Sequence, residues 1–128
     1  MSRAALALIG ILVGLGLFAG GLAWVLDTPK PPPGTPRVAR LYLGLCASCH
    51  GADGRGSWRA AVFLISTGNL ADHASGDQMD QYHFDIIKGG GAPLGRPGMP
   101  AFGGSLGDDD IRALVAYLRT LAQDGKRS

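Results

Sequence analysis

The chain has 128 residues and a mass of 13.2 kDa, which is enough for one small domain. Charged residues form 17% of the chain and the formal net charge is only +2. This balance lacks the basic stripe of a nucleic-acid-binding protein, so we expect no nucleic acid among its partners. A count of only two cysteines excludes a scaffold that is dense in disulfides.

The first segment, residues 1–26, is typical of a membrane anchor. Arg3 is its only charged residue, and the 23 residues that follow Arg3 are uncharged and mostly apolar. A helix of that length spans about 34 Å, which is enough to cross a bilayer. A signal peptide cleaved after Ala23 is the alternative, but its apolar core is normally shorter, at about 7–15 residues. Arg3 on the N-terminal flank predicts a cytoplasmic N-terminus, with the rest of the chain in the periplasm or an equivalent outer compartment and Trp24 at the far interface.

Glycines form two stripes on this expected anchor. Gly10 and Gly14 lie four residues apart, as do Gly16 and Gly20, and this spacing lets membrane helices approach one another closely. Glycine is also simply common in membrane helices, which is the plainer explanation. The stripes favour a chain held in a larger membrane complex over a freely moving, tethered carrier.

A proline-rich linker, residues 27–35, follows the anchor. Its consecutive prolines favour the extended polyproline II conformation, which makes a semi-rigid spacer. Nine residues in this conformation reach at most about 28 Å. The linker therefore keeps the following domain close to the membrane.

The remaining residues, 36–128, are expected to form one all-α domain. Thr35 followed by Pro36 predicts a helix N-terminus, and apolar residues at helical spacing continue to Leu45. Two further apolar stripes predict helices over 79–89 and 108–125, the second with three aspartates in its first turn. Glycine- and proline-rich loops connect these helices, and no segment has the alternation of a strand.

The segment Cys46-Ala-Ser-Cys49-His50 carries the chemistry of this domain. Cys-x-x-Cys-His is the attachment signature of a c-type haem. One helical turn brings the two thiols beside two vinyl groups on one porphyrin edge, and His50 can then reach the iron from the same side. Other interpretations are weaker. A thioredoxin-like pair usually lies near a βαβ unit, a zinc site needs four ligands, and a disulfide leaves His50 unexplained.

A second side chain is needed for the opposite face of the iron, and four are candidates: Met79, Met99, His73 and His83. Met99 lies in a flexible loop, where a thioether can approach the iron without straining a helix. Met79 and His83 lie on the apolar face of an expected helix, where core packing or lining of the haem pocket is the expected role. His73 lies in a polar stretch, where we expect it to be solvated.

Two motifs resemble those of class I cytochromes c. The first is Gly44-Leu-Cys46-Ala-Ser-Cys49-His50-Gly51-Ala-Asp53-Gly54, and the second is Met99-Pro100-Ala-Phe102-Gly103 followed by residues 106–118. The resemblance covers about residues 38–121 and implies a small all-α fold around one covalent haem c, here preceded by one transmembrane helix. It implies that Cys46 and Cys49 hold the haem, with His50 as the proximal and Met99 as the distal iron ligand.

The resemblance also implies that the first and last helices of the domain cross at Tyr42, Leu114 and Tyr117. One departure concerns the proline that many members carry soon after the haem motif, because residues 51–92 contain none. The partner that fixes the His50 ring is therefore left open. Trp58 and Tyr82 resemble residues that bond haem propionates, although plain core aromatics are an equal alternative.

The expected function is the transfer of single electrons, without enzymatic activity, because two axial ligands leave no open position on the iron. The expected partners are membrane lipid and a membrane redox complex, namely a quinol-oxidising complex, a terminal oxidase or a photosynthetic reaction centre. The chain would be a subunit of that complex or its tethered donor or acceptor. A haem enzyme or gas sensor with an open iron is the alternative, and it requires that Met99 not bind.

Overall fold

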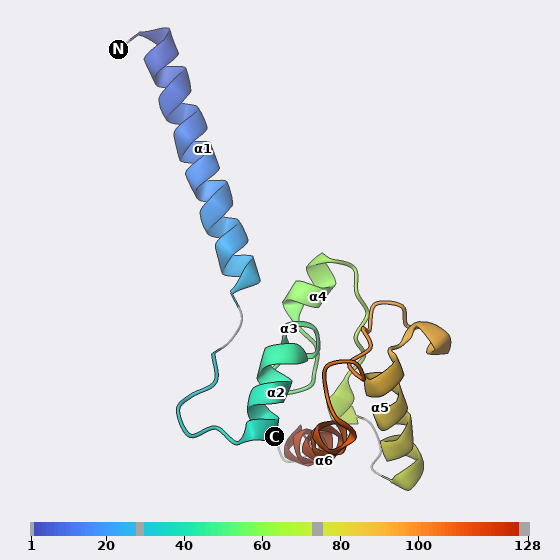
Figure 1. The fold of residues 1–128 in the computed structure, drawn as a ribbon. Helices are drawn as coiled ribbons and strands as arrows, with labels where there is room; N and C mark the ends of the chain where they lie inside the picture. Colours follow the sequence, from blue (N-terminus) through green and yellow to red (C-terminus); the bar gives the residue numbers. More distant parts are fainter. Residues whose placement is uncertain (1, 28–29, 73–75, 126–128) are drawn as a thin grey trace.

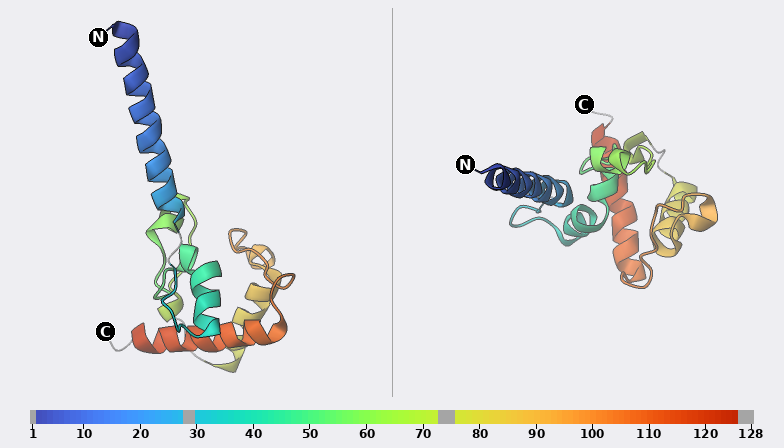
Figure 2. Two further views of the ribbon diagram at one scale, coloured as in Figure 1. Left: turned by 60° about the vertical axis from the view of Figure 1, so that its left-hand side comes forward. Right: turned by 90° about the horizontal axis from the view of Figure 1, so that it is seen from above.

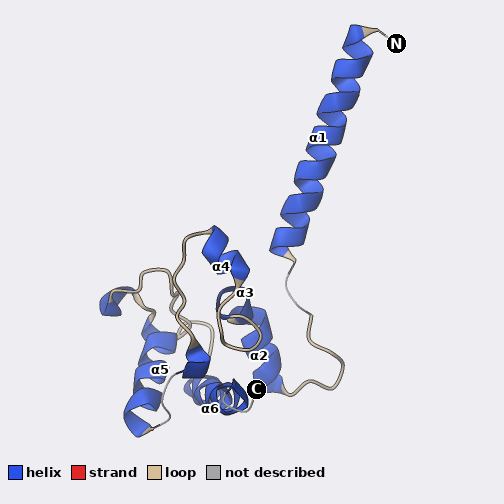
Figure 3. Ribbon diagram, turned by 180° about the vertical axis from the view of Figure 1, so that it is seen from behind, coloured by secondary structure: helices blue, strands red, loops and turns tan. Residues whose placement is uncertain are grey.

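The computed structural model describes residues 2–27, 30–72 and 76–125. Within these residues every regular element is a helix, and the segments between them are loops and turns (Figure 3). The expected all-α fold is confirmed.

The first helix, α1 (Arg3–Leu26), is a single rod of 24 residues that projects away from the rest of the chain (Figure 1). The Ser2 hydroxyl caps it by accepting a hydrogen bond from the Ala5 N–H at 3.2 Å. None of its residues is buried, and its length and composition allow it to cross a membrane. The bounds agree with the segment expected from the sequence.

The domain is built on its last helix, α6 (Asp108–Gly125). Two other helices, α2 (Arg37–Leu45) and α5 (Asp77–Gly89), pack on α6 at separate places (Figure 2). Tyr42, Ile111 and Leu114 are the largest fully buried side chains, and they lie where α2 crosses α6. The three amphipathic stripes in the sequence therefore supply the core, and the expected crossing of the first and last domain helices is present.

The start of α2 differs from the sequence expectation. The Thr35 hydroxyl does not cap the helix but donates a hydrogen bond back to the Pro32 carbonyl at 2.7 Å, and α2 begins at Arg37. Arg37 then forms an ion pair with Asp110 of α6 at 2.8 Å. The expectation of a Thr35 cap was wrong because the preceding prolines form a turn that engages this hydroxyl.

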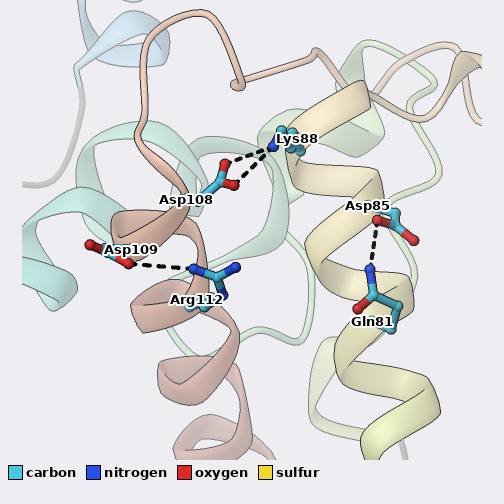
Figure 4. A network of polar contacts seen from close by, with 6 residues as sticks. All are labelled: Gln81, Asp85, Lys88, Asp108, Asp109 and Arg112. Atoms are coloured by element: carbon cyan, nitrogen blue, oxygen red, sulfur yellow. Dashed lines mark hydrogen bonds and ion pairs between the residues drawn. The ribbon is translucent and has the colours of Figure 1, made fainter.

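Exposed polar side chains fasten α5 to the start of α6 (Figure 4). The Lys88 ammonium of α5 contacts the Asp108 carboxylate of α6 at 2.8 Å, whereas the pair between Arg112 and Asp109, at 3.4 Å, lies within α6. The hydrogen bond from Lys88 holds the pKa of Asp108 below its usual value. Such exposed pairs contribute little to stability individually, so they orient the helices more than they hold them together.

The domain also contains four short helices, of which the first was expected as the helical turn of the Cys-x-x-Cys-His segment and the others were not: α3 (Ala47–His50), α4 (Trp58–Val62), η1 (Leu70–Asp72) and η2 (Ala92–Leu94). They have three to five residues each, too few to show a helical period in the sequence. The first two continue from α2 toward α1, and η1 packs against α6 (Figure 1).

Candidate haem site

The Cys-x-x-Cys-His segment forms its own helical turn at the end of α2. The Cys46 N–H donates to the Tyr42 carbonyl at 2.8 Å and continues α2, while the His50 N–H donates to the Cys46 carbonyl at 2.9 Å and closes α3. Both cysteines are half-buried, and their thiols are not joined to each other. This turn brings two thiols and one imidazole together, as covalent attachment beside an iron ligand requires.

Burial of the Cys46 thiol decides its chemical form. Desolvation, with a smaller effect of the neighbouring Cys49, raises the pKa of Cys46 to about 11. Burial therefore makes the thiolate form of Cys46 less favourable. Among the residues that the structure describes, no three His, Cys, Asp or Glu side chains gather as a metal site. The donor set suits a haem bound by thioethers better than a metal ion held by side chains alone.

The backbone after His50 folds back onto the motif. The His50 carbonyl accepts a hydrogen bond from the Gly56 N–H at 2.7 Å, and the Cys49 carbonyl accepts one from the Ser57 N–H at 2.9 Å. Gly51 has a φ of 78°, and a Cβ there would lie 2.6 Å from the Gly56 carbonyl oxygen, so this position requires glycine. The loop thereby fixes the turn that carries His50, whose Nδ1 atom is buried.

A buried tyrosine is hydrogen-bonded to the same loop. The Tyr42 hydroxyl donates a hydrogen bond to the Gly51 carbonyl at 2.8 Å, and its ring lies 5.3 Å from that of Tyr117 on α6. Tyr42 therefore joins the helix crossing to the residue directly after His50. The sequence showed the crossing through the family resemblance but gave no sign of this hydrogen bond.

Met99 lies in a loop whose far end is hydrogen-bonded to α5. The Gly91 N–H donates to the Met99 carbonyl at 2.9 Å, and the Phe102 N–H donates to the Ile87 carbonyl at 2.9 Å. The Met99 side chain is partly buried against the same core that Cys46 contacts. These hydrogen bonds attach the backbone on both sides of the Met99 side chain to α5 and to the residue that follows its cap.

The other candidate ligands have different surroundings. His83 on α5 is buried, and its ring lies 5.8 Å from that of Tyr82. Met79, also on α5, is half-buried. Both therefore belong to α5 as expected, while His73 lies outside the described residues.

The two aromatics that resemble propionate-bonding residues differ in burial. Tyr82 is partly buried against the core, whereas Trp58 is 49% exposed. The core interpretation of Trp58 was therefore wrong, because its ring stacks on Trp24 at the end of α1 with centroids 5.0 Å apart. No local sequence pattern indicates a contact between residues 34 positions apart, so the stack of Trp24 on Trp58 was not predicted.

Residues 34–118 match the family described as cytochrome c oxidase, cbb3-type, subunit III. The chain belongs to this family. The match spans both motifs and identifies the domain as a c-type cytochrome, which confirms the resemblance to class I cytochromes c and electron transfer as the general function. No curated protein and no solved structure matches the chain.

Proposed function

We propose that residues 36–128 form a mono-haem electron carrier in which Cys46 and Cys49 hold one haem c and His50 and Met99 are the axial ligands. The observation that carries this proposal is the α3 turn, which gathers the two free thiols and His50, together with a methionine held on the loop after α5. When bound, haem supplies a reversible one-electron change at iron.

The residues of the chain have separate tasks in this proposal. The thiols of Cys46 and Cys49 make attachment permanent, so the group is not lost between cycles. The loop bonded to the carbonyls of Cys49 and His50 keeps the imidazole in place. The thioether of Met99 favours a higher reduction potential than a second imidazole would. Ligation on both faces leaves no position for a substrate, which accounts for an electron carrier rather than a haem enzyme or gas sensor.

The experiment compares Met99→Ala with Met79→Ala, a half-buried methionine on the adjacent helix. The wild-type protein should be heavier than its chain by one haem that acid-acetone does not extract, and its oxidised form should show the weak far-red band of thioether ligation. Met99→Ala should abolish this band, lower the potential and admit CO to the reduced protein, whereas Met79→Ala should do none of these. A bare chain mass would refute attachment, and a Met99→Ala protein with an unchanged spectrum would refute the ligand.

We also propose that α1 spans a membrane with its N-terminus in the cytoplasm, and that residues 27–35 hold the haem domain against the outer face. Twenty-four residues with none buried suit a helix surrounded by lipid. The lone Arg3 flank supports this orientation. Since the family description names an oxidase subunit, the proposed partner is a membrane redox complex of the terminal oxidase type, with the chain as a fixed subunit.

The fixed-subunit proposal is tested in the anchor. Cβ atoms at Gly10 and Gly14 would meet nothing in the chain, so leucine at both positions leaves the helix itself unstrained. We expect Gly10→Leu with Gly14→Leu to remove the chain from the detergent-purified complex, with haem content and membrane insertion intact. Ala19→Leu, which lies outside both glycine pairs, is the control. Unchanged co-purification of the double variant would instead favour a tethered shuttle.

A further inference from the structure

Three large apolar side chains at the end of α4 point away from the domain core. Val62, Phe63 and Leu64, which we call the α4 strip, have exposed fractions of 62%, 61% and 93%. They are consecutive, so they form one apolar patch rather than scattered exposures. Contiguous exposed apolar patches on small domains mark surfaces that meet a partner or a membrane.

The backbone around Leu64 makes this exposure more informative. The Leu64 N–H donates to the Ala61 carbonyl at 3.0 Å, and the Ile65 N–H donates to the Ala60 carbonyl at 2.9 Å. These two bonds end the helix with Leu64 in the left-handed conformation at φ 56°, a position where glycine is favoured. The polypeptide therefore holds a large apolar side chain in the open, in a backbone conformation where glycine is favoured.

The α4 strip lies beside the end of the anchor helix. The Trp24 ring of α1 stacks on the Trp58 ring of α4 with centroids 5.0 Å apart and an interplanar angle of 26°. An Arg59 Nη2 donates to the Trp24 carbonyl at 3.4 Å, and the guanidinium lies 5.6 Å from the centre of the Trp58 ring. The left view in Figure 2 places α4 next to the lower end of α1, while α6 lies on the opposite side of the domain.

These contacts fix the depth of α4 relative to a membrane. Trp24 is in the last turn of α1, where tryptophan sits at the boundary between headgroups and acyl chains. Because Trp58 stacks on Trp24, α4 is at the same level. An apolar strip at that level meets acyl chains, and an arginine beside it meets lipid phosphates.

We infer that the α4 strip inserts into the interfacial layer of the bilayer that α1 spans, with Arg59 at the level of the phosphates. This inference rests on the proposed anchoring by α1 and adds a second membrane contact to it. The domain is then attached to the membrane both through α1 and through the α4 strip, rather than through the linker to α1 alone. Since the Ser57 N–H at the start of α4 is bonded to the Cys49 carbonyl, the haem-attachment turn acquires a set height above the membrane.

Spin labels on the full-length haem protein in liposomes test the inference, because Cys46 and Cys49 are consumed by haem attachment. Leu64→Cys reports on the strip, Leu17→Cys on the middle of α1, and Gln123→Cys on the exposed far side of α6. We expect the Leu64 label to show a several-fold higher ratio of oxygen to nickel-chelate accessibility than the Gln123 label. Equal ratios at these two positions would overturn the inference.

Further measurements distinguish a failure of this inference from a failure of the proposed anchor or of the proposed electron carrier. A Leu17 label as open to the chelate as Gln123 would refute the anchor, and the α4 contact with it, whereas haem mass and spectrum report on the electron carrier independently. In the Leu64→Cys background, Trp58→Ala should reduce the oxygen ratio because the stack is lost, while Trp58→Phe should preserve it. If the ratio of oxygen to nickel-chelate accessibility at the Leu64 label is the same in Trp58→Ala and Trp58→Phe, the stack does not position the α4 strip.

Discussion

Replacing Tyr42 with phenylalanine measures the contribution of the hydrogen bond between the Tyr42 hydroxyl, at the helix crossing, and the Gly51 carbonyl in the loop after His50. The Tyr42 side chain is fully buried, so phenylalanine fills the same space and only the hydroxyl is lost. The Gly51 carbonyl loses its 2.8 Å bond but keeps a longer bond of 3.3 Å from the Gly54 N–H. The cost should therefore lie near the lower end of the range for a buried unpaired group, at about 1 kcal/mol.

That loss converts into a measurable shift in melting temperature. For a domain of this size, about 1 kcal/mol lowers Tm by roughly 4–8 °C. Tm should be followed by haem absorbance in detergent, because α1 would contribute a helical signal that does not report on the domain. Tyr117→Phe is the matched control, because it removes a hydroxyl from the ring that lies 5.3 Å from Tyr42. A Tyr42→Phe protein that melts with the wild type, or no lower than Tyr117→Phe, would refute the reasoning.

The same substitution has a predicted pH dependence. Burial, ahead of any charge effect, raises the pKa of Tyr42 in the folded protein. The folded state thus favours the neutral phenol, and this contribution is complete below the unfolded pKa of about 10 and is lost as the pH rises above it. The Tm gap between wild type and Tyr42→Phe should narrow above pH 10. A constant gap would show that the phenol does not ionise on unfolding.

Three further predictions concern the core, the Met99 loop and acid stability. Leu114→Ala should cost about 2–5 kcal/mol, measured by denaturant unfolding, because the side chain is fully buried at the crossing. A Cβ at Gly91 would collide with the Arg96 carbonyl, so Gly91→Ala should weaken the far-red band while Gly104→Ala, in open space, should not. The hydrogen bond from Arg37 lowers the pKa of Asp110, so its contribution is present above the unfolded pKa of about 4 and is lost as the pH falls below it. Asp110→Asn should therefore lower Tm slightly at pH 7 and match the wild type at pH 2.

The sequence predicted the helices whose apolar residues recur with a helical period. Helices α2, α5 and α6 each bury one apolar face, and a buried face leaves a helical period that can be read directly. The α4 helix has five residues and ends in exposed apolar side chains, so no such period exists. In the haem site, too, some features could be predicted from the sequence and others could not. Cys46 to His50 is a local motif, whereas the bonds that Gly51 accepts from Tyr42 and Met99 accepts from Gly91 depend on the folded backbone.

The position of α6 at the end of the chain sets an order of events during biogenesis. Synthesis proceeds from the N-terminus, so the proposed anchor α1 would enter the membrane first, and the apolar face of α2 would have no partner until residues 108–125 have been made. Throughout that interval Cys46 and Cys49 belong to an open chain, because the crossing of Tyr42 with Ile111 and Leu114 cannot yet form. If the proposed attachment holds, both thiols would be open to a haem donor before the domain closes over them. A truncation before Asp108 would lack the helix on which α2 and α5 pack, so we expect it not to fold.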